Sequence, residues 1–249
     1  MKALITGASS GIGRDIAIEF AQRGYELILV ARRADKLEEI KNSVNVKCQT
    51  VSCDLSASEN CIKLCEWLVT ENIDVVVNCA GLGVFGEFAK TDLYKEINMI
   101  NTNITALHII TKFFVKKFVA ENKGYILNVA SAAAYAPGPM FSSYYASKAY
   151  VLRLTQAIAE EVRGTNVYIG ALCPGTVDTE FNAVANVGSG VNAMSSKYVA
   201  SYGISKMFKR KRIIIPGLKF KCTVFFSRFL PDSILANITH NFQKKKNNG

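Results

Sequence analysis

Three side chains capable of proton chemistry lie at a spacing that one helix and one neighbouring strand could bring together. Tyr144 and Lys148 are four residues apart, and Ser131 stands thirteen residues before Tyr144. Four residues is slightly more than one helical turn, so the phenol and the ammonium share one helix face and can act on one ligand. The adjacent Tyr145 would point roughly 100° around the helix, so Tyr144 is the expected acid and base.

A glycine-rich run at the start of the chain supplies the second signal. Gly7, Gly11 and Gly13 follow an expected strand at 2–6 and open an expected helix. Glycines in this position let the backbone approach a pyrophosphate at the N-terminus of the helix. A tight turn without a ligand is the less favoured interpretation, because strand, loop and helix come in the required order. Together with the tyrosine and lysine, the run predicts redox chemistry with a nicotinamide cofactor.

Short apolar runs alternate with longer amphipathic stretches, a pattern typical of a parallel sheet covered by helices. Strands are expected at 2–6, 26–31, 47–53, 74–78, 125–130, 167–172 and 212–215. Helices are expected at 12–23, 35–42, 58–70, 91–122, 142–163 and 195–208. The predicted fold class is α/β, a Rossmann-like doubly wound sheet of seven parallel strands with helices on both faces.

Three segments at 82–90, 132–141 and 176–194 resist this pattern, and we expect loops there. Each follows the carboxyl end of a strand, where open α/β sheets bind their ligands. Their glycines and prolines support the interpretation: Gly83, Gly86, Pro137, Gly138, Pro139, Gly188 and Gly190. The length favours one catalytic domain at 1–217, followed by a basic amphipathic tail at 218–249.

Several motifs, in order from Thr6 to Thr179, resemble those of the short-chain dehydrogenase/reductase family in its single-domain form. Thr6 to Gly13 match Thr-Gly-x-x-x-Gly-Ile-Gly, and residues 78–81 match Asn-Asn-Ala-Gly except that Cys79 replaces the second asparagine. Residues 174–179, Pro-Gly-Thr-Val-Asp-Thr, resemble the motif that lines the nicotinamide side. Four residues match the family's catalytic tetrad: Asn103, Ser131, Tyr144 and Lys148.

The resemblance implies a role for each of these residues. Tyr144 would exchange a proton with the substrate oxygen, Lys148 would favour the phenolate, and Ser131 would hold the substrate oxygen. Asn103 would hold a water that passes protons toward Lys148. The residues expected to bind the cofactor are Gly7, Ser9, Ser10, Gly11, Ile12, Gly13, Arg32, Arg33, Asp54, Leu55, Asn78, Ala80, Gly81, Tyr144, Lys148, Pro174, Gly175, Val177 and Thr179.

The end of the second strand indicates which cofactor is preferred. An NAD-selecting site would offer Asp or Glu to the ribose there, whereas this chain has Arg32 and Arg33. Guanidinium groups suit a 2′-phosphate by charge and bidentate geometry, so we predict NADP(H) rather than NAD(H), with Arg32 as the stronger contact. Asp54, at the end of the third strand, resembles the family's adenine contact; it could instead be a carboxylate near a helix N-terminus.

The substrate follows less directly from the sequence. Apolar residues in the loops would surround the nicotinamide: Phe85, Tyr135, Met140, Phe141 and Phe181. We therefore expect a small-molecule substrate, a hydrophobic ketone or aldehyde or the matching alcohol. The alternatives are an epimerase or dehydratase using the same residues, for which the chain is short, and a catalytically silent nucleotide sensor or scaffold on the same fold. Retention of the whole tetrad favours the enzyme.

Cysteine content and charge narrow the setting. The seven cysteines are odd in number and form no C-x-x-C pair, which favours a reducing compartment, and with only two histidines no metal site is expected. Residues 1–204 carry 19 basic and 19 acidic side chains, whereas residues 205–249 carry 11 basic side chains and one acidic, Asp232. The excess positive charge therefore belongs to the tail.

In the tail, apolar and basic residues alternate, and Ile234, Leu235, Ile238 and Phe242 fall at helical spacing. Two interpretations of the tail are equally favoured: an amphipathic element on an anionic membrane, or an apolar stripe packed on this domain or a second subunit.

The resemblance implies a homo-dimer or homo-tetramer, and no nucleic acid partner is expected. No apolar stretch reaches the roughly 18 residues needed to span a bilayer, and residues 2–5 already read as strand. We expect a cytoplasmic protein, peripheral to the inner membrane surface if the tail binds lipid.

Overall fold

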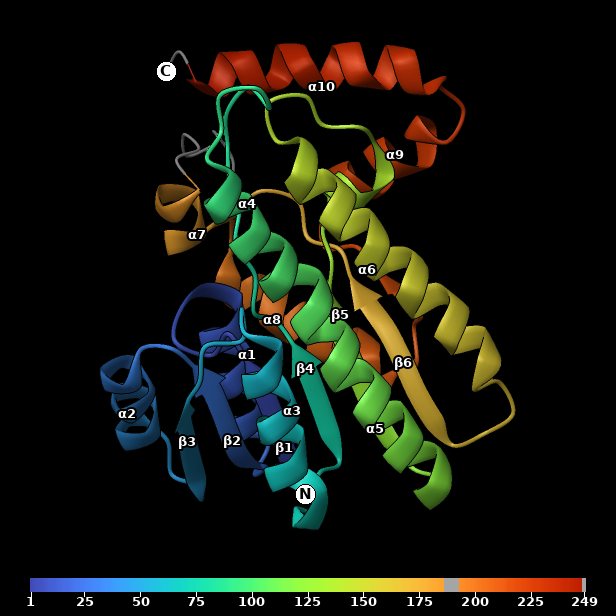
Figure 1. Ribbon diagram of the computed structural model, residues 1–249. Helices are drawn as coiled ribbons and strands as arrows, with labels where there is room; N and C mark the ends of the chain where they lie inside the picture. The colour runs from blue at the N-terminus through green and yellow to red at the C-terminus, as the bar shows by residue number, and fades with distance from the viewer. Residues whose placement is uncertain (186–192, 248–249) are drawn as a thin grey trace.

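The computed structural model describes residues 1–185 and 193–247, and its centre is a parallel β-sheet (Figure 1). The strands of this sheet are β1 (Lys2–Thr6), β2 (Glu26–Ala31), β3 (Cys48–Ser52), β4 (Val75–Asn78), β5 (Gly124–Val129), β6 (Val167–Leu172) and β9 (Ile213–Ile214). They are arranged in the order β3-β2-β1-β4-β5-β6-β9, and every neighbouring pair is parallel. The predicted seven-stranded doubly wound sheet is confirmed.

Burial explains why these segments form central strands. β6 is buried at all six positions and β4 at all four, as expected where helices cover both faces of a parallel sheet. The strand order runs outward in both directions from β1 and β4, so the chain crosses from one side of the sheet to the other between them. Such a switch point opens a crevice at the carboxyl ends of the strands.

Helices form a layer on each face of the sheet (Figure 1). The principal helices are α1 (Gly11–Gln22), α2 (Ala34–Ser43), α3 (Ser58–Trp67), α4 (Leu93–Ile100), α5 (Leu107–Glu121), α6 (Ser142–Glu161) and α8 (Ser196–Phe208). The apolar faces of α1, α2 and α8 share one core cluster with the sheet, and those of α3, α5 and α6 belong to the clusters on the other face.

Two segments differ from the sequence prediction. The helix expected at 91–122 is interrupted by a π-helical turn at Asn101–Ala106, a register change that a hydrophobic pattern does not reveal. The loop expected at 176–194 contains β7 (Val177–Asp178) and α7 (Glu180–Val184), and β7 pairs with β8 (Met194–Ser195). Strands of two residues are too short for periodicity to detect. Gly188 and Gly190 lie outside the described residues.

The tail forms two helices, α9 (Leu218–Ser227) and α10 (Asp232–Asn247), and α10 lies across the top of Figure 1, beyond the carboxyl ends of the strands. The division into 1–217 and 218–249 stays a prediction. In the described ranges no helix is long and apolar enough to cross a membrane. The same ranges hold no cluster of three or more His, Cys, Asp or Glu side chains suited to a metal ion.

Candidate active site

A cavity of about 800 Å³ opens at the carboxyl ends of the strands, at the switch point of the sheet. Most of the residues predicted to act there line it: Gly7, Ser9, Ser10, Gly11, Ile12, Gly13, Arg32, Arg33, Asp54, Leu55, Ala80, Gly81, Ser131, Tyr144, Lys148, Pro174, Gly175, Val177 and Thr179. Asn78 and Asn103 do not line the cavity. The structure therefore brings together residues that follow six strands, β1 to β6, and residues from α6.

Two glycines at the junction of β1 and α1 occupy positions with no room for a side chain. Gly7 has φ of 65°, and a Cβ on Gly13 would lie 2.2 Å from the carbonyl oxygen of Gly7. At the start of α1, the side chain of Ser10 makes no capping hydrogen bond and the first turn contains no acidic residue. The N–H groups and positive dipole end of α1 therefore face the cavity without a competing carboxylate, an arrangement that suits a pyrophosphate.

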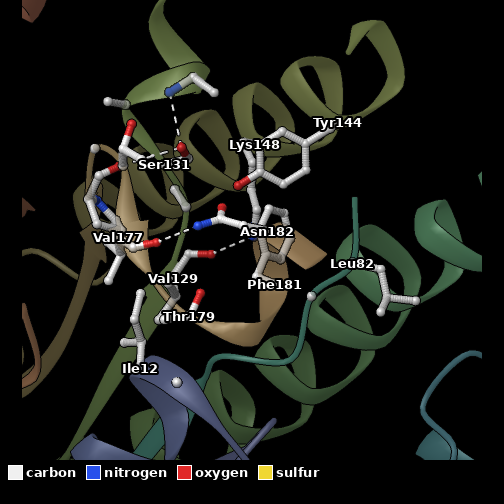
Figure 2. A pocket seen from close by; sticks show the side chains of 18 of the residues that line it. Ile12, Leu82, Val129, Ser131, Tyr144, Lys148, Val177, Thr179, Phe181 and Asn182 are labelled. Atoms are coloured by element: carbon white, nitrogen blue, oxygen red, sulfur yellow. Dashed lines mark hydrogen bonds between the residues drawn. The ribbon is translucent and has the colours of Figure 1, made fainter. Parts of the chain in front are cut away.

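Tyr144 and Lys148 project from one face of α6 into the cavity, beside the end of β5 (Figure 2). The Lys148 Nζ donates a hydrogen bond of 3.0 Å to the carbonyl oxygen of Val129 and lies 5.7 Å from the centroid of the Tyr144 ring. The Phe141 ring stacks on the Tyr144 ring, with 4.4 Å between the centroids and 16° between the planes. The phenol is thus fixed between an apolar ring and a buried cation.

Burial dominates the electrostatics of this pair. It lowers the pKa of Lys148 to about 8, with the Cys79 and Cys173 thiols acting weakly in the opposite direction. It also raises the pKa of Tyr144 to about 12, and the neighbouring Ser131 hydroxyl offsets only part of this rise. The direction for Tyr144 is opposite to the one expected from Lys148 alone, because loss of water around the phenolate outweighs the nearby cation. At neutral pH Tyr144 is a neutral phenol that can donate a proton.

Ser131 follows β5 and begins a short 3-10 turn at Ala132–Tyr135. Its Oγ accepts a hydrogen bond of 3.1 Å from the backbone N–H of Ala133 and donates one of 3.5 Å to the carbonyl oxygen of Pro174. The second bond is long, so this hydroxyl is free to turn toward a ligand oxygen in the cavity.

Asn103 lies in the π-helical turn, behind the cavity wall. Its Oδ1 accepts a hydrogen bond of 2.8 Å from the N–H of Leu82, and its amide donates to the Leu82 carbonyl and to Ser147 Oγ, each at 3.0 Å. A Cβ on Gly81 would lie 3.3 Å from both Asn103 Oδ1 and Lys148 Nζ, so the two residues flank the same glycine. Here Asn103 ties the loop after β4 to α6, and its water-holding role stays a prediction.

Asn78 lies at the end of β4, beneath the cavity rather than in its wall. Its amide donates hydrogen bonds to Thr111 Oγ1 at 3.1 Å and to Asn128 Oδ1 at 2.9 Å, which joins two strands to α5. The loop above is held by Thr6 Oγ1, which accepts from the N–H groups of the next two residues, Cys79 and Ala80. In this geometry Asn78 supports the loop and does not reach the cavity.

Charged residues gather at the rim expected to hold the ribose and adenine. Arg33 donates to Ser9 Oγ at 3.2 Å and forms an ion pair of 2.9 Å with Glu180. Arg32 is exposed and makes no salt bridge with any described residue. Asp54 Oδ1 accepts from the N–H of Ser56 at 3.0 Å, so this carboxylate closes a turn before α3 and does not cap the helix.

Three of the five predicted substrate contacts line the cavity: Tyr135, Phe141 and Phe181. Phe85 packs edge-on against Phe141 at 5.8 Å and Met140 has φ of 64° in the loop, and neither is part of the wall. The sequence prediction missed a group of wall residues from the tail: Lys219, Phe220, Thr223, Val224, Ser227, Leu235, Ile238, Thr239, Phe242 and Gln243. The helical spacing of the tail was a usable signal, but it did not show which surface the helices meet.

Comparison with known proteins agrees with this geometry. A family model described as short chain dehydrogenase matches residues 1–190. An uncharacterized oxidoreductase of Staphylococcus epidermidis is 31% identical over 179 residues, covering 71% of this chain and 78% of that protein. The 7beta-hydroxysteroid dehydrogenase of Mediterraneibacter gnavus is 31% identical over 182 residues, covering 71% of this chain and 68% of the enzyme.

Solved structures show the same fold. A short-chain dehydrogenase from Sphingobium yanoikuyae in complex with NADPH has a TM-score of 0.83 and 29% identity, covering 87% of this chain and 88% of that one. A short-chain dehydrogenase/reductase from Burkholderia phymatum in complex with NAD has a TM-score of 0.80 and 22% identity, covering 89% and 90% of the two chains. One of these structures holds NADPH and the other NAD, so the comparison does not select between the two cofactors.

Proposed function

This chain belongs to the short-chain dehydrogenase family and is an oxidoreductase of CH–OH and C=O groups, and we propose on that premise that it interconverts an apolar ketone or aldehyde and its alcohol with NADP(H). One observation carries the proposal. Tyr144, a half-buried phenol, and Lys148, a buried ammonium, face one cavity from adjacent turns of α6, with the glycine-rich loop opposite.

The residues on the nucleotide side fit a dinucleotide. Gly7, Gly11 and Gly13 would admit the pyrophosphate to the N-terminus of α1, and Asp54 would lie near the adenine. Arg32, which has no competing carboxylate among the described residues, would contact a 2′-phosphate, with Arg33 beside it. When bound, the nicotinamide supplies or accepts the hydride.

The protein's own part in the reaction is proton transfer and orientation. Tyr144 donates its phenolic proton to the carbonyl oxygen, while the Ser131 hydroxyl holds the same oxygen. Lys148 stabilises the resulting phenolate from the same helix face, an interaction that strengthens because the pair is buried. Phe141 and Phe181 cover the phenol and keep water away from it.

The substrate side favours an apolar molecule. Aromatic side chains of the loops form one wall, and apolar side chains of α9 and α10 form another, including Phe220, Val224 and Leu235. Within the part of the chain that the structure describes, the carboxylates lining the cavity are Asp54 and Glu180, of which Glu180 pairs with Arg33 on the nucleotide side, and the tail adds one cation, Lys219. Since apolar side chains make up most of the substrate wall, a hydrophobic carbonyl compound matches it best.

Replacing Tyr144 tests the proposal. In Tyr144→Phe, we expect kcat to fall roughly 10²- to 10⁴-fold, while NADPH affinity measured by calorimetry changes little. Tyr150→Phe is the matched control, since this tyrosine lies on the same helix, is exposed and contacts His108 outside the cavity. Equal turnover by Tyr144→Phe and the control would contradict the assignment. Tight cofactor binding without turnover by the native protein would favour the nucleotide sensor.

We further propose that the tail rests on an anionic membrane surface. Phe225 and Phe226 on α9 and Phe229 just after it form an exposed aromatic cluster, in which the Phe225 ring centroid lies 5.4 Å from each of the other two. The tail is strongly basic, so two copies of it would repel each other across a symmetric interface, whereas anionic lipid adds roughly 1 kcal/mol of attraction per Lys or Arg. The compartment follows from this as a proposal: cytoplasmic, at the inner membrane surface.

Sedimentation with vesicles separates the two interpretations of the tail. The full chain should pellet with phosphatidylglycerol-containing vesicles, less so with phosphatidylcholine alone, and less at high salt. The double variant Phe226→Glu/Phe229→Glu should stay in the supernatant, whereas the control Ile62→Glu, an exposed apolar site on α3, should pellet like the native chain. Equal pelleting of all three proteins would rule out membrane contact through this cluster.

Self-association is proposed through α4 instead. This helix exposes a row of large apolar side chains: Leu93, Tyr94, Ile97 and Ile100. We expect sedimentation velocity to show a dimer or tetramer, and Ile97→Glu to shift it toward monomer. A monomeric native chain would contradict the proposal.

A further inference from the structure

A buried amide side chain from the tail reaches into the largely apolar substrate half of the cavity. Gln243, on α10, is only 3% exposed and lines the cavity between the tail and α6. A buried amide is costly unless its oxygen and its nitrogen both find partners. How Gln243 is satisfied therefore bears on what the cavity binds.

Only half of the Gln243 amide is satisfied. Its Nε2 donates a hydrogen bond of 3.0 Å to the hydroxyl of Tyr145, whereas Oε1 is buried and has no hydrogen-bond partner within the described residues. An unpaired buried acceptor destabilises the fold, so few native side chains leave one. In a cavity wall, that acceptor is a place where a ligand donor gains a full hydrogen bond.

Tyr145 provides the complementary group. Burial raises its pKa, so its hydroxyl keeps a proton at neutral pH, and that proton is not used in accepting from Gln243. The two side chains together offer one donor and one acceptor a short distance apart. A hydroxyl group is the ligand that matches both, because it can donate to one partner and accept from the other.

The pair is held in place from both sides. Thr239, one helical turn before Gln243, donates a hydrogen bond of 2.7 Å to the carbonyl oxygen of Pro137, which fixes α10 to the loop after β5. The Tyr145 ring packs over Gly138, where any Cβ would lie 2.3 Å from the ring. A fixed donor and acceptor can discriminate between ligands, since neither can turn away from a poor one.

We propose that Gln243 and Tyr145 form a hydroxyl-recognition site, so that the substrate is an apolar carbonyl compound carrying a hydroxyl group away from the reacting carbon. The inference rests on the proposed function and specifies its substrate class. Tyr144 and Tyr145 are adjacent in sequence, with ring centroids 6.3 Å apart and different directions on α6. One helix thus presents the reacting group and the recognition group to two parts of one molecule.

Paired ketones test the proposal. The probes are bicyclohexyl and straight-chain ketones of increasing length, each with and without a hydroxyl group at the end remote from the carbonyl. For the best-fitting pair, the native enzyme should favour the hydroxylated member by roughly 10- to 100-fold in kcat/KM. Gln243→Leu should remove this preference while keeping turnover of the member without the hydroxyl.

Two further variants separate recognition from folding. Gln243→Glu keeps an acceptor and should retain part of the preference. Tyr145→Phe removes the donor to the ligand and also the hydroxyl that accepts from Gln243 Nε2, so it should reduce the preference as well. NADPH binding by calorimetry should be equal in all four proteins, which shows that the cavity is intact. The same hydroxyl preference in the native enzyme and Gln243→Leu, or no preference in either, would overturn the inference while leaving the proposed function standing. No turnover of any probe by the native enzyme would overturn both.

Discussion

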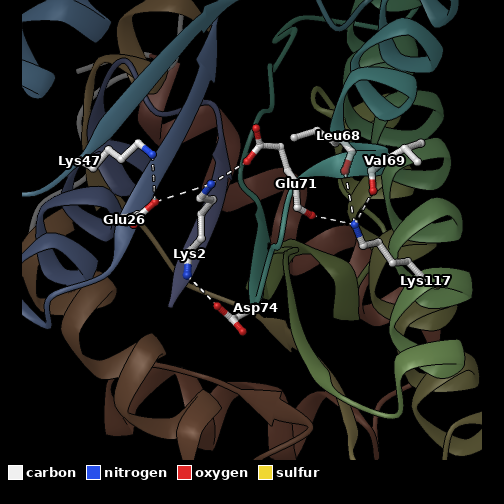
Figure 3. Close-up of polar contacts among 8 residues, drawn as sticks. All are labelled: Lys2, Glu26, Lys47, Leu68, Val69, Glu71, Asp74 and Lys117. Atoms are coloured by element: carbon white, nitrogen blue, oxygen red, sulfur yellow. Dashed lines mark hydrogen bonds and ion pairs between the residues drawn. The ribbon is translucent and has the colours of Figure 1, made fainter.

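The two ends of the parallel sheet differ in how well their lysine side chains are paired with anionic and carbonyl groups. At the amino ends of the strands, Lys2 lies between Glu71 at 2.6 Å and Glu26 at 3.6 Å, and its backbone N–H donates to Asp74 (Figure 3). Nearby, Lys117 donates hydrogen bonds to three backbone carbonyls after α3, those of Leu68, Val69 and Glu71. Both of these cations have anionic or carbonyl partners.

At the carboxyl ends, the buried cation has far less compensation. Lys148 is 5% exposed and donates to one backbone carbonyl, and no carboxylate among the described residues pairs with it. The pKa of Lys2 is raised, first by its hydrogen bond to Glu71, whereas burial lowers the pKa of Lys148 to about 8. The paired charge of Lys2 stabilises the fold. The unpaired charge of Lys148 remains available to stabilise the Tyr144 phenolate that forms in the reaction.

Removing the unpaired cation should produce the largest effect. In Lys148→Met, we expect kcat to fall roughly 10²-fold or more, because the Tyr144 phenolate loses its stabilising charge. The variant should also be more stable than the native protein at pH 7, by roughly 1–3 kcal/mol, since burying the ammonium costs energy that Met does not. Denaturant unfolding at several pH values measures the second effect.

The extra stability expected of Lys148→Met should decrease as the pH rises. The pKa of Lys148 is about 8 in the folded protein, against an ordinary value of 10.5. Between these values the unfolded chain holds a proton that the folded protein has released, so native stability rises with pH. The advantage of Lys148→Met should be full below pH 8 and should vanish by about pH 10.5. A variant less stable than the native protein at pH 7 would contradict the comparison of the two ends.

Cofactor selection at the rim should show a smaller effect. In Arg32→Asp, we expect the ratio of NADPH to NADH affinity to fall roughly 10- to 100-fold, since a charge-assisted contact to the 2′-phosphate becomes a repulsion. Lys36→Asp is the charge-matched control, because this exposed residue on α2 does not line the cavity. An unchanged affinity ratio in Arg32→Asp would place the 2′-phosphate contact elsewhere.

The smallest effect should come from the paired cation at the amino ends. In Lys2→Met, we expect a loss of about 1 kcal/mol in the free energy of unfolding and no change in kcat. Since pairing raises the pKa of Lys2, its contribution is present below pH 10.5 and is lost as pH rises through the folded value. Unfolding and turnover of the same preparation measure both. A change in kcat without a change in the free energy of unfolding would contradict the assignment of Lys2 to the fold and not to the reaction.

The sequence was sufficient for the parts of the fold that depend on periodic burial. Strands such as Val167–Leu172 and helices such as Ser142–Glu161 lie within two residues of their predicted ends, because continuous apolar runs and amphipathic spacing report burial directly. The π-helical turn at Asn101–Ala106 was not predictable, since it is set by tertiary hydrogen bonds such as those between Asn103 and Leu82.

The site was predictable where chemistry depends on spacing within one element, and less so where it depends on packing. The spacing of Tyr144 and Lys148 placed both in the cavity, yet burial moved the tyrosine pKa in the opposite direction from that expected. Asn78 matched a motif but lies below the cavity, because Thr111 and Asn128 hold it in the core. The contact between Gln243 and Tyr145 joins residues 98 positions apart, and no local pattern encodes it.

Calorimetric titration of the purified chain with NADPH and with NADH, followed by absorbance at the nicotinamide band with a panel of apolar ketones and aldehydes, tests the central claim most directly. The claim is that the carboxyl end of the sheet binds a phosphorylated dinucleotide and reduces a carbonyl there. We expect NADPH to bind at least about tenfold more tightly than NADH, and at least one panel member to oxidise it. Binding of neither cofactor would contradict the account.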